Sequence, residues 1–130
     1  DGADAWKRLE QHFEQSWSNF RGMLSDPGDQ QLAARGEMIL CATAVFSPDP
    51  ALREKLKLVI GRFIHTVTEA LELCIRDGIV RPEIDAASVA IFYTSSIWGL
   101  VNALFAEPDN EAKISGSAEV LHHFMQTLRT

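Results

Sequence analysis

The sequence contains little cysteine: Cys41 and Cys74 are the two thiols in 130 residues. Neither thiol has a second Cys or a His at metal-site spacing, so a zinc-finger framework is excluded. Both lie in apolar stretches, where we expect reduced thiols packed as small hydrophobic side chains in a cytoplasmic protein. A disulfide between them is the alternative, with little in the sequence to favour it.

Basic residues are also few. There are 12 Lys and Arg against 18 Asp and Glu, which leaves a net charge of −6, and the basic residues are scattered. Nucleic-acid binding needs clustered cations that neutralise phosphates, so we expect none by this chain itself. No signal peptide is visible, and no uninterrupted apolar run approaches the ~18 residues that indicate a membrane span. We therefore expect no membrane partner.

Catalytic motifs are missing. No Ser or Cys lies in a glycine elbow, and no dinucleotide-binding or P-loop spacing occurs. Glu119 and His122 form the one E-x-x-H pair, whereas a di-iron bundle needs two such pairs and two further glutamates. His65 and Glu69 lack a third and a fourth metal ligand. We expect no enzyme activity, no catalytic residue, no metal and no cofactor; a small helical-bundle metalloenzyme using Glu119 and His122 is a less favoured alternative.

Helical periodicity is what the sequence does contain. Apolar residues recur at intervals of three and four positions, as on one face of a helix, and no alternating strand pattern is seen. Length and the 46% hydrophobic fraction fit one globular domain over residues 1–130. The predicted fold class is all-α, a bundle of five helices: Ala3–Leu24, Asp29–Phe46, Pro50–Asp77, Ala86–Ala106 and Asn110–Leu128.

A helix stop followed at once by a helix start lies at the centre of the chain. Gly78 is placed for a left-handed C-terminal cap, Pro82 cannot continue a helix, and Asp85 is placed as the next N-cap. Asp49 and Pro50 are an equally clear start signal for the preceding helix. These signals predict two long helices joined by a tight corner.

Those two helices are unusually apolar. Hydrophobic residues take most of the surface of the Pro50–Asp77 segment after Leu58, and Ala86–Ala106 has no charged residue. A helix that is apolar most of the way round needs neighbours on several sides. Because a domain of this size has too little chain to cover both, the uncovered face predicts a protein–protein interface.

The order of these signals resembles the C-terminal domain of TetR-family transcriptional regulators. The resemblance covers nearly the whole chain and depends on residues spread along it: Arg35-Gly36, Asp49-Pro50, Gly78-Ile79-Val80-Arg81, Ile84-Asp85 and Gly99-Leu100. Family members often have Cys after the glycine that matches Gly36, whereas this chain has Glu37. That departure is expected to alter one edge of a ligand pocket.

The resemblance implies a sensor and dimerisation domain. Family members begin with a helix-turn-helix unit that reads the DNA major groove, and no short basic recognition helix precedes Trp6. DNA would then be bound only through an N-terminal domain that these residues do not include. The resemblance implies a homodimer in which the last two helices of each copy form a four-helix bundle. It also implies repression relieved when a small ligand shifts the two DNA-reading units.

A ligand pocket is expected between the first four helices. Its expected lining combines aromatic, apolar and hydroxyl side chains: Trp17, Phe20, Met38, Cys41, Phe63, Thr66, Val67, Phe92, Ser95 and Ser96. For any one of these residues, packing in the core is the plainer interpretation. Aromatic richness and Glu37 predict an apolar or weakly cationic effector.

The expected dimer contacts lie on the last two helices. They are Ile91, Ser95, Trp98, Gly99, Asn102, Leu121, Met125 and Leu128. The alternative is a helical interaction module that binds another protein through the same surface and senses no ligand.

Overall fold

The computed structural model describes residues 1–25 and 47–130, apart from the side chains of residues 20, 23–25 and 105. The described part contains α1 (Gly2–Ser25), α3 (Pro50–Arg76), α4 (Ala86–Ala106), the short 3-10 helix η1 (Pro108–Asn110) and α5 (Glu111–Gln126). No strand occurs in these ranges beyond an isolated bridge between Val80 and Arg129. The all-α prediction is confirmed for them. The helix predicted over residues 29–46 lies outside the described part.

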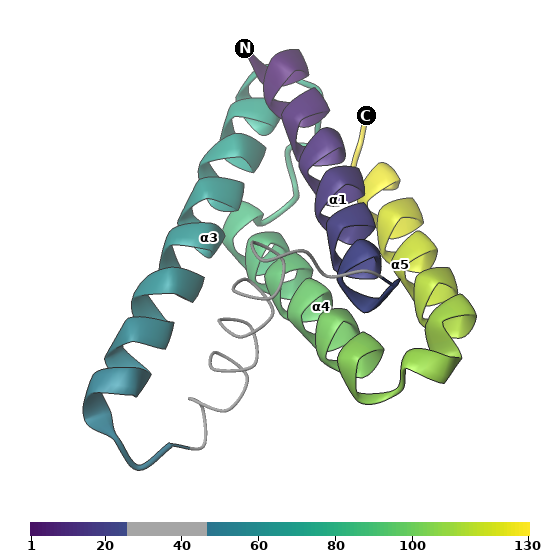
Figure 1. Cartoon of the computed structure of the whole chain (residues 1–130). Helices are drawn as coiled ribbons and strands as arrows, with labels where there is room; N and C mark the ends of the chain where they lie inside the picture. Colours follow the sequence, from purple (N-terminus) through teal and green to yellow (C-terminus); the bar gives the residue numbers. More distant parts are fainter. Residues whose placement is uncertain (26–46) are drawn as a thin grey trace.

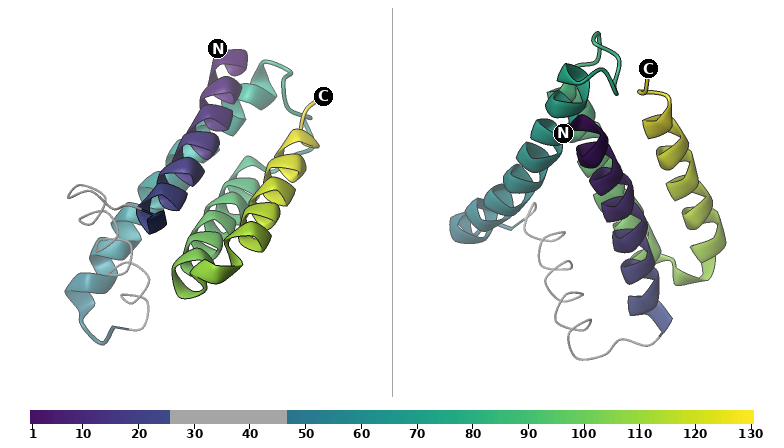
Figure 2. Two further views of the ribbon diagram at one scale, coloured as in Figure 1. Left: turned by 45° about the vertical axis from the view of Figure 1, so that its right-hand side comes forward. Right: turned by 90° about the horizontal axis from the view of Figure 1, so that it is seen from above.

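The helices pack in a chain of neighbours. α3 contacts both α1 and α4, and α4 also contacts α5. In Figure 1, α3 diverges from the other helices along its length, whereas α4 and α5 run side by side. Figure 2 shows the same divergence in two further views, with the N- and C-termini at the same end. α3 therefore has close described neighbours mainly along its C-terminal half.

The helix-stop signal after α3 has the predicted geometry. Gly78 has a φ of +73°, in the left-handed region that favours glycine. The N–H of Ile79 donates to the carbonyl of Cys74 at 2.8 Å, and that of Gly78 donates to Ile75 at 3.1 Å. These two bonds form a Schellman cap, which satisfies carbonyl groups that the helix end leaves free.

The N-caps also match their predictions. Asp49 accepts a hydrogen bond of 3.0 Å from the N–H of Ala51, with Pro50 at the first helical position. Asp85 accepts from the N–H of Ala87 at 3.2 Å and from the hydroxyl of Ser88 at 2.6 Å. The side-chain bonds at Asp85 lower the pKa of its carboxyl group, with Ser88 as the largest cause.

The corner between α3 and α4 is bound to the C-terminal tail. The N–H of Arg81 donates to the carbonyl of Leu128 at 3.0 Å, and the N–H of Thr130 donates to that of Ile79, also at 3.0 Å. The hydroxyl of Thr130 donates to the carbonyl of Gly78 at 2.9 Å. The tail thus holds the end of α5 against the corner that follows α3.

The core lies where α1, α4, α5 and the C-terminal half of α3 meet. Its largest fully buried side chains come from α3, the corner and α4: Leu71, Cys74, Val80, Thr94, Val101 and Leu104. Trp6, Phe13 and Trp17 of α1 are also buried. Burial raises the pKa of Cys74, a free thiol. Cys41, its alternative disulfide partner, lies outside the described residues.

Candidate functional site

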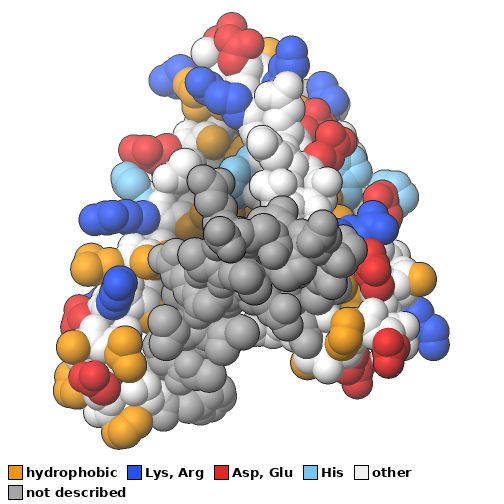
Figure 3. Space-filling view, viewed as in Figure 1, with side chains coloured by type: hydrophobic (Ala, Val, Ile, Leu, Met, Phe, Trp, Pro, Cys, Tyr) orange, Lys and Arg blue, Asp and Glu red, His pale blue; other side chains and the backbone are white. Residues whose placement is uncertain are grey.

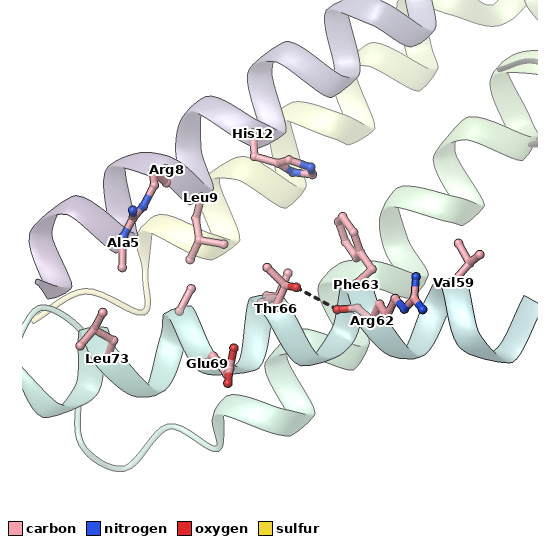
Figure 4. A pocket seen from close by; sticks show the side chains of 12 residues that line it. Ala5, Arg8, Leu9, His12, Val59, Arg62, Phe63, Thr66, Glu69 and Leu73 are labelled. Carbon is pink, nitrogen blue, oxygen red and sulfur yellow. Dashed lines mark hydrogen bonds between the residues drawn. The ribbon is translucent and has the colours of Figure 1, made fainter.

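A cavity of about 660 Å³ lies between α1 and α3. We call it the α1–α3 groove, and Figure 4 shows its side chains. Its volume falls within the ~300–1,000 Å³ typical of small-molecule sites. The lining residues come from successive turns of the two helices: Ala5, Arg8, Leu9, His12, Val59, Arg62, Phe63, Thr66, Val67, Glu69, Ala70 and Leu73.

The groove is mostly apolar because each helix presents one stripe to it. Leu9 of α1 and Phe63 of α3 point toward the space between the helices (Figure 4). Val67 is only 3% exposed and closes the floor. Phe63 also contacts the ring of His12, with centroids 5.3 Å apart. These walls suit an apolar ligand, since contact with them removes its surface from water.

The polar groups of the groove lie around its edge. Arg8 and Arg62 are exposed and are found toward opposite ends of the row of side chains in Figure 4. Glu69 is exposed and pairs with His65, with Nε2 and Oε1 3.3 Å apart. The hydroxyl of Thr66 donates to the backbone carbonyl of Arg62 at 2.9 Å, as hydroxyl groups inside helices commonly do.

The structure brings together part of the predicted ligand site. Phe63, Thr66 and Val67 line the groove as expected. Trp17 is buried in the core and does not line it. The side chain of Phe20 is not described, and Met38 and Cys41 lie outside the described residues, so these three predictions stay untested.

Three predicted ligand contacts lie elsewhere. Phe92 and Ser96 line a separate groove between α4 and α5, and Ser95 is exposed on α4. The physical reason is the register of α4: its buried side, with Ala90, Thr94 and Val101, is the one that faces the other helices. Phe92 lies on the opposite side of α4 and is 50% exposed.

The ligand site expected from the sequence included α1, but through Trp17 and Phe20 and not through the residues of α1 that line the groove. Ala5, Leu9 and His12 follow the three- and four-residue spacing of a helix face, adjacent to the buried stripe of Trp6, Phe13 and Trp17. Trp17, which the sequence indicated for the pocket, lies on the buried stripe instead. The spacing of the smaller residues was the available signal.

An exposed apolar surface lies on the other side of the molecule, on α4 and α5. We call Phe92, Val120 and Phe124 the α4–α5 surface; their exposed fractions are 50%, 67% and 39%. The two phenylalanine rings meet edge to face, with centroids 5.0 Å apart. Beside them is a shallow groove of about 470 Å³, to which Gly99 contributes. A Cβ built on Gly99 would meet no described atom within 4 Å.

The predicted dimer contacts divide into two groups. Ile91, Ser95, Gly99 and Asn102 are exposed and Trp98 is half-buried, whereas Leu121, Met125 and Leu128 are in the core of the single chain. The buried stripe of α5 was therefore misassigned to the interface, because its own chain covers that stripe. Val120 and Phe124, four residues apart, form the outward apolar face of this helix.

The remaining surface does not show a concentration of positive charge on the face in Figure 3. Lys and Arg side chains are interspersed there with Asp and Glu, and apolar side chains gather at the lower end of α3. Leu52, Leu58 and Val59 in that half of α3 are 37%, 57% and 36% exposed. This part of α3 is a second apolar region, distinct from the α4–α5 surface.

The residues considered for metal binding are not grouped. The ring of His122 stacks on Phe13, with centroids 5.6 Å apart, whereas Glu119 is exposed. Within residues 1–25 and 47–130, no three His, Cys, Asp or Glu side chains are placed to hold a metal ion. His65 and Glu69 are an exposed pair, as expected from their spacing.

α4 is long and apolar enough to cross a membrane by length and composition over Ala86–Leu104. About a third of that stretch, 33%, is buried inside the protein, and a central helix of a globular domain meets the same criterion. No family model, curated protein or solved structure matches the chain.

Proposed function

We propose that this chain is the effector-binding and dimerisation domain of a TetR-like transcriptional repressor in the cytoplasm. A small apolar ligand would bind in the α1–α3 groove, and a second copy of the chain would cover the α4–α5 surface. Ligand binding would relieve DNA binding by an N-terminal domain outside these residues. The proposal depends on one observation above all: an apolar-walled groove and an exposed apolar surface occupy different sides of one small helical domain.

The groove supports the sensing part of this function. Its volume of about 660 Å³ and its mainly apolar walls match the general character of small-molecule sites. No nucleophile–base arrangement was found in the sequence, and the polar groups of the groove lie at its edge. Reversible binding of a ligand requires an apolar groove with polar groups at its edge and does not require catalytic groups.

The α4–α5 surface supports the dimerisation part. α4 has no charged side chain between its N-cap Asp85 and Glu107, so association would not desolvate a charge on this helix. Phe92 and Phe124 are large aromatic side chains of the kind enriched in interface cores. The open space above Gly99 would let another backbone come close.

A row of aromatic contacts connects the two regions. Phe63 in the groove wall lies parallel to Tyr93 of α4, with centroids 6.4 Å apart and an interplanar angle of 4°. Tyr93 contacts Phe13 at 6.3 Å, and Phe13 stacks on His122 of α5. A ligand that displaces Phe63 would therefore disturb packing against both helices of the α4–α5 surface, which is the physical coupling that an allosteric sensor needs.

The oligomeric state tests the proposal directly. We expect light scattering with size-exclusion chromatography to give a homodimer, and Val120→Glu to give a folded monomer, because a charge would enter the centre of the apolar contact. Val120 is 67% exposed, so the substitution leaves the core intact. Leu58→Glu is the matched control: Leu58 is 57% exposed on α3, and this variant should remain a dimer. A parent chain that is monomeric at all accessible concentrations would refute the dimerisation part.

A measurement of ligand binding distinguishes the proposed sensor domain from the alternative, a helical interaction module that would bind another protein through the α4–α5 surface and sense no ligand. Calorimetric titration with an apolar probe, 1-dodecanol, should show saturable binding to the parent chain. Thr66→Trp should weaken it strongly, since a small groove residue would be replaced by a side chain bulky enough to obstruct the middle of the groove. A dimer that binds no apolar probe would favour the interaction module. If elemental analysis found a metal in stoichiometric amount, the helical-bundle metalloenzyme would be favoured.

A further inference from the structure

We infer that the ligand of the α1–α3 groove is an elongated amphiphilic anion, whose anionic group binds Arg62 and whose apolar tail lies along the groove toward Leu73. This inference rests on the proposed sensing function and gives the chemical class of the effector. A free carboxylate with an unbranched hydrocarbon chain is the simplest molecule of this class.

The charged side chains of the groove indicate that the ligand is an anion. Among the residues that the structure describes, the charged side chains lining the groove are Arg8, Arg62 and Glu69, with His12 in addition. Glu69 is already paired with His65, and neither arginine has an ion-pair partner among the described residues. An anion would gain attraction from the unpaired guanidinium groups, whereas a cation would be repelled by them. This differs from the weakly cationic effector expected from Glu37, which lies outside the described residues.

The surroundings of Arg62 identify it as the better anchor of the two arginines. From Lys55 to Thr68, α3 has no acidic residue, so no carboxylate of the same helix competes for this guanidinium. Arg8 differs because Asp4 lies four residues before it on α1, a spacing at which side chains on a helix are neighbours, although no ion pair joins the two and Oδ2 of Asp4 lies 4.0 Å from the N-terminal ammonium group. Arg8 therefore has a carboxylate one turn away on its own helix, and Arg62 has none.

The length of the groove indicates that the ligand has an extended apolar tail. Arg62 and Leu73 are 11 positions apart on α3, which corresponds to about 17 Å along a helix at 1.5 Å per residue. Between them the groove is lined by Phe63, Val67 and Ala70, with Leu9 and Ala5 opposite. A long, mostly apolar groove with Arg62, unpaired among the described residues, toward one end fits an extended chain with an anionic head better than a compact polar molecule.

Three probes with the same tail and different heads test the inference: dodecanoate, 1-dodecanol and dodecyltrimethylammonium. Each is titrated by calorimetry as a monomer near neutral pH, where the carboxylate is ionised. Circular dichroism checks that the chain stays folded. We expect dodecanoate to bind up to about fivefold tighter than dodecanol, as a favourable ion pair at an exposed site would allow, with the ammonium weakest. Octanoate should bind more weakly than dodecanoate, by at most about fourfold per methylene lost.

Variants locate the head group. Arg62→Gln should remove the preference for dodecanoate over dodecanol, measured as the ratio of the two dissociation constants. Arg53→Gln is the matched control, because it removes the same charge from an exposed position of the same helix outside the groove. Its preference should equal that of the parent chain. Raised salt should weaken the preference in the parent and not in Arg62→Gln.

The outcomes separate this inference from the function on which it rests. Binding of dodecanol and dodecyltrimethylammonium as tightly as dodecanoate would overturn the anion while the apolar groove stands. An equal loss of preference in Arg53→Gln would overturn Arg62 as the anchor. Absence of binding by all three probes would refute the sensing function itself. Sedimentation with phosphatidylglycerol vesicles without binding of monomeric dodecanoate would indicate a lipid headgroup as the source of the anion, and would overturn the free ligand.

Discussion

The N–H of Gly2 donates a hydrogen bond of 2.6 Å to Oδ2 of Asp77, joining the first turn of α1 to the C-cap of α3. The thiol of Cys74 donates to the carbonyl of Gly2 at 3.3 Å from the same helix end. A Cβ on Gly2 would lie 2.8 Å from the Cβ of Asp77, closer than side chains tolerate. The two helices that form the ligand groove are thus held together at one end by a close backbone contact.

This contact predicts a pH dependence. The hydrogen bond from Gly2, followed by that from Arg76, lowers the pKa of Asp77 in the folded state. A lowered folded-state pKa means that the ionised carboxylate favours folding. Its contribution is present above the unfolded pKa and is lost as the pH falls through the folded value. We expect Asp77→Asn to make the fall in unfolding free energy below about pH 4 shallower, measured by urea titration at several pH values. An unchanged acid limb would contradict the role of Asp77.

Replacing Gly78 in the left-handed cap and Gly61 inside α3 by alanine should change the free energy of unfolding in opposite directions. Gly78→Ala should lower the free energy of unfolding by roughly 1–2 kcal/mol, because alanine is strained at a φ of +73°. Gly61→Ala should raise it by up to about 1 kcal/mol, since Gly61 lies inside α3, no described atom lies within 4 Å of the added Cβ, and alanine is the better helix former. Urea unfolding of both variants measures the difference. A gain in Gly78→Ala would show that the cap is not formed.

Tyr93 is expected to tolerate replacement by phenylalanine. Its hydroxyl group is buried without a hydrogen-bond partner among the described residues, and desolvation raises its pKa to about 12. Because no described residue forms a hydrogen bond with that hydroxyl group, we expect Tyr93→Phe to be neutral or to stabilise the fold by up to about 1 kcal/mol. Tyr93→Ala should cost about 3–5 kcal/mol, as the ring packs against Phe13 and Phe63. A net hydrogen bond contributes about 1 kcal/mol to stability. If Tyr93→Phe lowered the free energy of unfolding by more than about that amount, the hydroxyl group would have to be hydrogen-bonded in the folded protein.

Gly99 predicts opposite effects on the fold and on association. Gly99→Ala should stabilise the monomer by up to about 1 kcal/mol, as in Gly61→Ala, because both glycines lie inside helices with no described atom near the added Cβ. In the proposed dimer the same methyl group would crowd a second copy, and should weaken association by about tenfold. Analytical ultracentrifugation compares the dissociation constants, with Gly61→Ala as the control that keeps the parent value. Equal constants would place Gly99 outside the interface.

Helix positions could be predicted from local chemistry. The predicted spans of the long helices end within a residue or two of Gly2–Ser25, Pro50–Arg76, Ala86–Ala106 and Glu111–Gln126. The caps at Asp49, Gly78 and Asp85 were equally accessible, because they depend on backbone groups a few residues away. The excess of apolar surface on α4 was visible too, since it follows from the lack of charged residues in that segment.

Which face meets which neighbour could not be derived in this way. Periodicity identifies an apolar stripe, but the stripe that another helix covers depends on crossing angles and on contacts far apart in the sequence. For that reason Met125 and Leu128 were placed at an interface and lie in the core, while Phe92 was placed in a pocket and lies outside it. The helices and their ends were therefore determined by the sequence itself, through hydrogen bonds made locally. Only tertiary packing decided that the groove lies between α1 and α3, and that Arg62 is at its edge.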